Sequence, residues 1–161
     1  MAHTYAVAGS GAAADAATAA LDDAGLDAAG TGLDAIMSAD VAVVVGLAGS
    51  DGFAAANARA RRGGTPWLAV EIGGVGGHPI ADVDAAVTAF DDESGCFACL
   101  ERRVAAGDPA TTAEPSAARS SVRYAGALAG KRALDLLDGA VQAGSVVEVP
   151  HAERSFTPAP F

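Results

Sequence analysis

The chain has 161 residues, of which 51% are hydrophobic and 5% aromatic, and its formal net charge is -10. This length predicts one domain over residues 1–161 with a core of its own. The acidic balance excludes a nucleic-acid partner, because phosphate backbones are bound by clustered Lys and Arg, and no apolar run approaches the roughly 20 residues needed to cross a membrane.

The first half of the chain predicts strands that alternate with helices. The expected elements are a strand at Thr4–Ala8, helices at 12–24 and 33–38, a strand at 40–45, a helix from Ser50-Asp51 to Gly63-Gly64 and a strand at 67–72. No clear strand is expected around residues 30–32, and Ser50 and Asp51 are expected to cap their helix. The alternation predicts an α/β, Rossmann-like fold with a mostly parallel sheet flanked by helices.

The rest of the chain is less regular. The expected elements are a glycine-rich loop at 73–79, a strand at 85–90, a helix at 100–106, a long helix at 119–137 and a last strand at 146–149. Residues 107–117 contain few bulky apolar side chains, which predicts a mobile connection. We therefore divide the domain into a Rossmann-like half at 1–94 and a second half at 95–161.

Gly9, Gly11 and Ala14 match the G-x-G-x-x-G/A pattern of nucleotide-binding turns, between a strand and a helix. Backbone N–H groups and the helix dipole can bind a pyrophosphate at such a turn. A dinucleotide site also needs an acidic residue after the second strand, but neither candidate, Asp27 or Asp34, follows a clear strand. We therefore favour the alternative that the glycines let the first helix pack closely on the sheet.

Cys96 and Cys99 are the two cysteines of the chain, and they form a C-x-x-C pair at the start of a predicted helix. This spacing is typical of zinc sites. Structural zinc takes four ligands, so the pair supplies half a site. His78, His151, another chain or a segment outside this sequence could supply the rest. A redox pair and two inert thiols are the alternatives.

Glu71 stands near the end of the strand at 67–72, before the glycine-rich loop. The carboxyl ends of parallel strands face the crevice where open α/β sheets bind ligands, so Glu71 is a candidate crevice residue. The alternative is a glycine-rich surface loop that another polypeptide approaches closely. The sequence contains no Ser-His-Asp order, paired-carboxylate signature or Walker motif, so no catalytic residue is predicted.

The charge pattern and the start of the chain bear on its origin. Acidic residues are dispersed, and Lys131 is the one lysine. This favours a halophilic archaeon over the alternative of a GC-rich genome, because a negative surface keeps proteins in solution in strong salt. No secretory signal is recognised at the start, so a soluble cytoplasmic protein with reduced thiols is expected.

Four segments together carry a family resemblance: the turn at 9–14, TPWLAVEIGG, GCFACLERR and the closing VVEVPHAERSFTPAP. They resemble the E1/ThiF-like domain of cyclodehydratases that make azoline or thioamide peptides in bacteriocin biosynthesis, as in the N-terminal portion of haloarchaeal YcaO-domain proteins. In that family a second C-x-x-C follows the proline-rich segment. The resemblance implies that Cys96 and Cys99 are the first half of a zinc site and that the chain is a piece of a longer protein, ending at Phe161 where the second pair would begin.

The resemblance also implies a domain that does not adenylate. True E1-like enzymes surround the triphosphate with acidic and basic residues that are not found in position here, so Gly9, Gly11 and Ala14 would be a remnant of the nucleotide loop and no ATP binding is expected. The implied role is a homodimeric scaffold that engages a precursor peptide or a YcaO catalytic partner. The alternatives are a small nucleotide- or NAD(P)-binding Rossmann enzyme and a structural dimerisation module.

Overall fold

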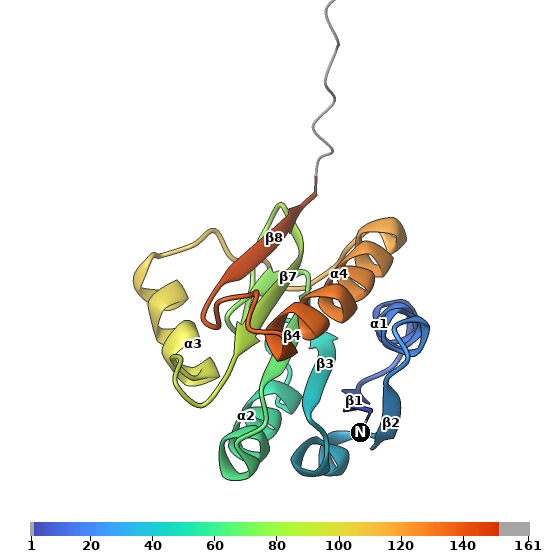
Figure 1. The fold of residues 1–161 in the computed structure, drawn as a ribbon. Coiled ribbons are helices and arrows are strands. Elements are labelled where there is room, and N and C mark those ends of the chain that lie inside the picture. Colours follow the sequence, from blue (N-terminus) through green and yellow to red (C-terminus); the bar gives the residue numbers. More distant parts are fainter. Residues whose placement is uncertain (1, 152–161) are drawn as a thin grey trace, which may run out of the picture.

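The computed structural model describes residues 2–151, which form a six-stranded sheet with helices on both faces (Figure 1). In spatial order the strands are β2 (Asp27–Thr31), β1 (Thr4–Ala8), β3 (Val41–Leu47), β4 (Trp67–Ile72), β7 (Val83–Phe90) and β8 (Val146–Pro150). The first four run parallel, whereas β7 and β8 are antiparallel to their neighbours. The predicted α/β fold with a mostly parallel sheet is confirmed.

The helices form two layers. On one face of the sheet lie α1 (Ala12–Asp23) and α4 (Arg119–Leu137), and on the other lie the 3-10 helix η1 (Leu33–Ser38), α2 (Gly52–Gly63) and α3 (Phe97–Ala106) (Figure 1). A separate cluster of buried residues lies beneath each layer. Among residues 2–151, no helix is both long enough and apolar enough to cross a membrane.

The central strands are apolar on both faces because both faces are covered. In β3, Val41 and Val43 belong to the cluster under α1 and α4, whereas Ala42 and Val44 belong to the cluster under α2. Successive side chains of a strand point to opposite faces, so a strand between two helix layers must be apolar at every position. This is why the continuous run of valines predicted the strand correctly.

The two layers pack by different means. Between the sheet and α2 and α3, aromatic rings stack, with centroids 5.3 Å apart for Phe53 and Phe97 and 4.9 Å apart for Trp67 and Phe90. On the other face α4 approaches α1 through glycine: a Cβ at Gly126 would lie 2.1 Å from the carbonyl oxygen of Ala13. The α1–α4 contact is therefore made backbone to backbone, which the small residues of both helices permit.

Residues 27–31 form a strand that the sequence analysis did not expect. β2 pairs in parallel with β1, with Asp27 opposite Thr4, although its sequence is DAAGT and its side chains are mostly exposed. An edge strand of this kind is held by backbone hydrogen bonds to one neighbour and needs few buried side chains. An apolar pattern therefore cannot reveal it.

Three local expectations are corrected. The glycine-rich segment is not an irregular loop, because Gly74–Val75 (β5) and His78–Pro79 (β6) pair as a small antiparallel hairpin. The N-cap residue of α2, Asp51, makes no side-chain capping hydrogen bond. The helix expected at residue 100 begins at Phe97, with Cys96 as its N-cap.

The connection at 107–117 contains no helix and only one isolated bridge, between Thr111 and Ile80. The N–H of Ala81 donates to the carbonyl oxygen of Ala110 at 3.1 Å, and the N–H of Thr112 donates to that of Pro79 at 3.1 Å. These contacts tie the connection to the hairpin; its mobility stays a prediction.

Candidate functional site

The glycine turn lies where the strand order of the sheet reverses. β1 lies between β2 and β3, and Gly9 and Gly11 follow its carboxyl end. Ligands of open α/β sheets bind at such reversals. Both glycines have positive φ angles, 115° and 88°, which other residues rarely adopt. Gly11 is the N-cap of α1, so the backbone passes through this turn directly into the helix.

The close packing of the turn against the sheet explains why its residues are small. A Cβ at Gly9 would lie 2.3 Å from the carbonyl oxygen of Val45 in β3, so a larger residue would push the turn off the sheet. Ala14 is buried in the cluster beneath α1, whereas Gly11 faces open space. The remaining residues of the turn, from Ser10 to Ala13, carry no charge. These contacts favour the packing interpretation of the turn, and the expected loss of ATP binding here stays a prediction.

The two acidic residues considered for a ribose contact lie at opposite ends of β2. Asp27 begins the strand, and Asp34 follows it within η1. The carboxylate of Asp34 is exposed and accepts a hydrogen bond from Nη2 of Arg59 at 3.2 Å. An acidic residue therefore does follow the second strand. The sequence does not reveal its position, because the strand DAAGT before it has no apolar pattern.

Glu71 does not open onto a crevice. Its side chain is 0% exposed, and its two carboxylate oxygens accept hydrogen bonds from the N–H groups of Gly76 at 2.7 Å and Gly77 at 2.6 Å. Burial raises the pKa of Glu71 above its usual range, although the two amide hydrogen bonds oppose this. The carboxylate fastens the hairpin to β4, so the expected crevice position is corrected: no surface of this side chain is open to a ligand.

Cys96 and Cys99 lie at the start of α3, with their Sγ atoms 3.1 Å apart. The hydrogen bond with the Cys99 thiol, the N–H groups of Cys99 and Ala98 and the charge of Arg61 lower the pKa of the Cys96 thiol, against the effect of burial. A lower pKa favours the thiolate, which is the form that binds metals. The role of the pair as two zinc ligands stays a prediction.

The histidines considered as further zinc ligands lie elsewhere. Nε2 of His78 lies 3.2 Å from the carbonyl oxygen of Glu101, and Nδ1 of His151 lies 2.8 Å from Oδ1 of Asp84. Within residues 2–151, no three His, Cys, Asp or Glu residues gather in a way that could hold a metal ion. The expectation that either histidine completes the site is wrong for this part of the chain, and four-coordinate zinc would need ligands from elsewhere.

Asp84 and His151 form an acid–base pair that the sequence analysis missed. Asp84 is buried and also accepts a hydrogen bond from the N–H of Ala118, just before α4, at 3.4 Å. Burial acts to raise the pKa of Asp84, but hydrogen bonds from Ser121, His151 and Ala118 outweigh it and hold the pKa below its usual range. The bond to Asp84 raises the pKa of His151. The partners are 67 residues apart, so no local pattern signals them.

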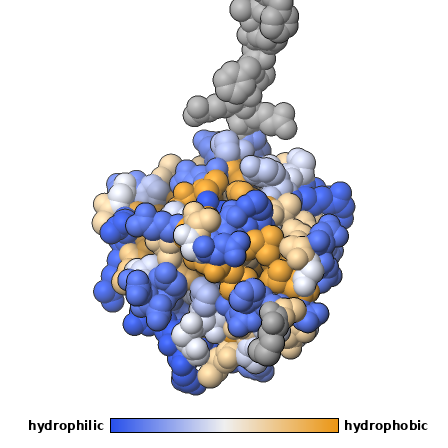
Figure 2. Space-filling model, viewed as in Figure 1, coloured by the Kyte–Doolittle hydropathy of each residue, from blue (hydrophilic) through white to orange (hydrophobic). Residues whose placement is uncertain are grey.

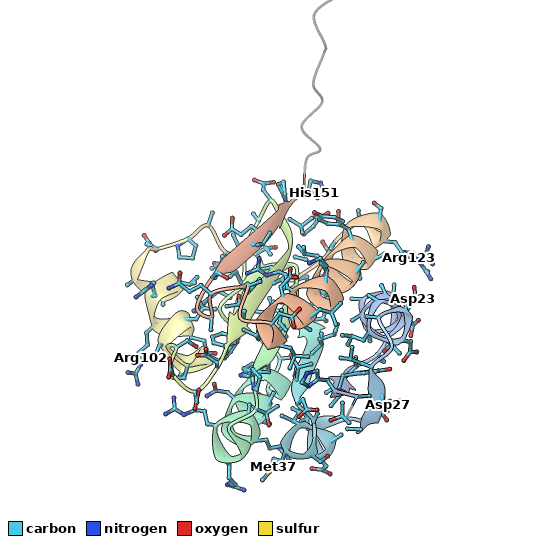
Figure 3. The ribbon with its side chains drawn as sticks, viewed as in Figure 1. Asp23, Asp27, Met37, Arg102, Arg123 and His151 are labelled. Carbon is cyan, nitrogen blue, oxygen red and sulfur yellow. The ribbon has the colours of Figure 1, made fainter. Side chains whose placement is uncertain are left out.

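A groove of about 510 Å³ lies between α1 and α4. It is lined by Ala12, Asp15, Ala16, Arg119, Arg123, Tyr124 and Ala127. The described ion pairs within residues 2–151 include neither Arg119 nor Arg123, and Tyr124 is 59% exposed. Arg123 projects outward from α4 in Figure 3. The groove therefore presents two guanidinium groups without a partner in the described part of this acidic chain.

The fold is shared with a heterocyclase and with E. coli MccB. The chain matches a heterocyclase in complex with substrate and cofactor over 93% of its length, with a TM-score of 0.62 and 18% identity. It matches E. coli MccB with SeMet MccA over 97% of its length (TM-score 0.56, 9% identity), and MccB with succinimide over 92% (TM-score 0.55, 10% identity). These similarities confirm the Rossmann-like fold of the E1-like type.

The match covers different shares of these larger proteins. The chain spans 23% of the heterocyclase chain and 66% and 64% of the two MccB chains. No protein-family model matches the sequence, and no curated protein matches it. At these sequence identities the similarity establishes a common fold. It does not establish that this chain has the activity of the larger proteins.

Proposed function

We propose that this chain is a non-adenylating, E1-like recognition domain that engages a precursor peptide or a YcaO-type partner during ATP-dependent modification of a peptide backbone. The observation that carries the proposal is the glycine turn. In a fold shared with a heterocyclase and MccB, Gly9 packs on β3 and the other side chains of the turn itself, from Ser10 to Ala13, are small and uncharged. Such a turn keeps the backbone path but supplies no charged side chain to grip a triphosphate.

The solved structures support a peptide or protein partner. One is a heterocyclase that holds its substrate, and another is MccB together with MccA. In this chain Figure 2 shows hydrophobic residues gathered near the middle of the face that carries α4 and β8, with hydrophilic residues around them. An apolar centre with a polar rim is the usual anatomy of a protein contact surface.

The groove between α1 and α4 is the surface that we assign to an acidic peptide. Arg119 and Arg123 can each bind a carboxylate with two parallel hydrogen bonds. Tyr124 adds an exposed ring at the rim, and the alanines leave room for a backbone to approach. Asp15 adds one negative charge to the same lining, so the groove should select where along the peptide its acidic groups lie.

Titration with ATP and Mg²⁺ by calorimetry tests whether the domain binds ATP, which adenylation would require. We expect no binding tighter than about 1 mM, which corresponds to roughly -4 kcal/mol. A tighter complex at the glycine turn would contradict the proposal. Controls with buffer and Mg²⁺ alone remove heats of dilution.

Fluorescence polarisation with a labelled peptide rich in Asp and Glu tests the recognition role. The double variant Arg119→Gln/Arg123→Gln should weaken binding at least about tenfold. The matched control is Arg62→Gln/Arg102→Gln, which removes the same charge from exposed positions on α2 and α3. Equal weakening in both variants would show that net charge alone attracts the peptide, and the groove would then have no role.

A small NAD(P)- or ATP-binding enzyme is the second candidate, and Asp34 favours it. This residue follows β2, where a Rossmann enzyme places the acid that contacts the ribose. Thermal-shift titration with NAD(H), NADP(H) and ATP separates the two functions, because a ligand at 100 times its Kd adds about 2.7 kcal/mol to stability. No shift with any of these ligands would remove the enzyme candidate.

A further inference from the structure

A second cavity lies between the sheet and α3, and the proposed function makes no use of it. Its volume is about 130 Å³, and it is lined by Thr88, Phe90, Gly95, Cys96, Cys99, Leu100, Arg103 and Gly144. We call it the α3 cavity. An apolar cavity of about 150 Å³ in another protein accommodates benzene, so this one has room for a ligand of similar size.

Thr88 is the unusual member of the lining. It lies on β7, between Ala69 of β4 and Val146 of β8, whose side chains have no hydrogen-bonding atoms. Its side chain is 1% exposed, and within residues 2–151 its Oγ1 has no hydrogen-bond partner. Buried hydroxyl groups in folded proteins are nearly always hydrogen-bonded. A polar atom held in the cavity would give this hydroxyl the partner that the surrounding protein does not supply.

The other lining residues define the rest of the ligand. Phe90 and Leu100 form apolar walls, and Arg103, which is exposed, brings a guanidinium group to the same cavity. The described ion pairs do not include Arg103. A guanidinium group binds carboxylates with directed hydrogen bonds, so the cavity combines a cation, an apolar wall and a buried hydroxyl.

We propose that the α3 cavity binds a small organic carboxylate that carries a second polar group. The carboxylate pairs with Arg103, the carbon skeleton contacts Phe90 and Leu100, and the second polar group bonds the hydroxyl of Thr88. A free organic acid and the acidic side chain or carboxyl end of a peptide both have this chemistry. The inference does not depend on the α1–α4 groove or on the proposed peptide role.

The test is a titration of the full chain followed by ¹H–¹⁵N NMR, with lactate, malate and glutamate as probes at constant ionic strength. At least one acid should shift the signals of Thr88, Arg103 and Gly144 saturably. Lactamide, which lacks the charge of lactate, should bind at least about tenfold more weakly than lactate. A short Asp- and Glu-rich peptide is titrated in parallel, and saturable shifts with the peptide alone would identify a peptide as the source.

Three variants make the test specific. Arg103→Gln should weaken binding about tenfold or more, whereas Arg102→Gln, on the same helix but outside the cavity lining, should leave it unchanged. Thr88→Val keeps the branched shape without the hydroxyl, so it should weaken binding about tenfold while raising the Tm of the free protein by about 2–4 °C. If Thr88→Val proves unstable, Thr88→Ser replaces it in the test. This variant keeps the hydroxyl and should retain binding.

No saturable shift with any acid or with the peptide would mean that the cavity holds only water. Wild-type affinity in both Arg103→Gln and Thr88→Val would place the binding elsewhere. Equal losses in Arg102→Gln and Arg103→Gln would reduce the effect to the charge of α3.

Discussion

Glu71 shows how a single buried carboxylate organises the segment that follows it. The sequence places Glu71 beside four glycines, and in the structure its oxygens bind the N–H groups of Gly76 and Gly77. Gly76 and Gly77 have positive φ angles of 60° and 76°, so the hairpin depends on glycine at both positions. The carboxylate holds in place a turn that glycine makes possible.

Glu71→Gln should lower the free energy of unfolding by about 1–3 kcal/mol, because the amide NH₂ group cannot accept a hydrogen bond and one buried N–H loses its partner. Urea denaturation measures this change. Glu148→Gln, at an exposed position on β8, is the control and should have almost no effect. Equal stability of the two variants would show that the hairpin does not depend on the carboxylate.

The Asp84–His151 pair makes stability depend on pH. The raised pKa of His151 means that its contribution is present below the ordinary value of about 6.5 and is lost as pH rises through the folded-state pKa. The lowered pKa of Asp84 means that its contribution is present above about 3.9 and is lost as pH falls through the folded-state pKa. The pair therefore stabilises most between those two limits.

His151→Gln should thus lower Tm most between about pH 4 and 6.5, and the difference from the wild type should shrink at higher and lower pH. Thermal unfolding over a pH series measures it. His78→Gln serves as the control, because it removes a histidine that lies outside the pair. A difference that is constant with pH would show that the imidazole contributes packing rather than charge.

The α1–α4 layer shows how two helices of small residues pack on the sheet. The predicted bounds of α4 are those observed, since its apolar residues recur at helical spacing. Its approach to α1 depends on Gly126 and Gly130, where a Cβ would lie 2.1 Å from the carbonyl oxygen of Ala13 and 2.6 Å from the Cβ of Ala20. Both glycines let α4 pack closely against α1. They therefore also position the wall of the groove that α4 forms.

Gly126→Ala should destabilise the protein by about 1–3 kcal/mol, although alanine favours helices, because the added methyl group separates the helices. Gly52→Ala, at the first residue of α2 with no atom within 4 Å of the added Cβ, should instead be neutral or stabilise by up to about 1 kcal/mol. Urea denaturation of both variants gives the comparison. Equal effects would mean that helix propensity decides both substitutions and that α1 and α4 can move apart freely.

At the scale of the whole molecule, the parallel strands β2, β1, β3 and β4 carry the glycine turn, and the antiparallel strands β7 and β8 extend the sheet beside the thiol pair. The chain spans only part of the larger proteins that share its fold. If the two thiols bind a metal, the remaining ligands must come from a second copy or from another segment, because no third ligand lies with them among residues 2–151.

If two copies share one site, purified protein should contain about one zinc ion per two chains, and Cys96→Ser should abolish it. Elemental analysis measures the zinc, and size-exclusion chromatography with light scattering measures the dimer. Thr4→Ser, far from the thiols, is the control and should keep both properties. A dimer without zinc in the wild-type protein would exclude shared ligation and leave the thiols as a redox pair or inert.

The sequence by itself determined the elements whose own residues form a recognisable apolar pattern. β1, β4 and α4 have the predicted bounds, and β3 differs from its predicted bounds only at its ends. A buried strand must be apolar throughout, and the apolar residues of a surface helix must recur with a period of 3.6 residues. Both elements therefore leave a local pattern in the sequence. The C-x-x-C pair and the glycine turn are likewise local.

Only the tertiary structure decided the rest. β2 is a strand because β1 offers it hydrogen bonds, Glu71 is buried because the hairpin folds back over it, and Asp84 meets His151 because β7 and β8 pair. The orphan hydroxyl of Thr88 arises in the same way, because its neighbours Ala69 and Val146 come from segments distant in the chain. Such interactions depend on what surrounds a residue, and its immediate neighbours in the sequence do not encode that.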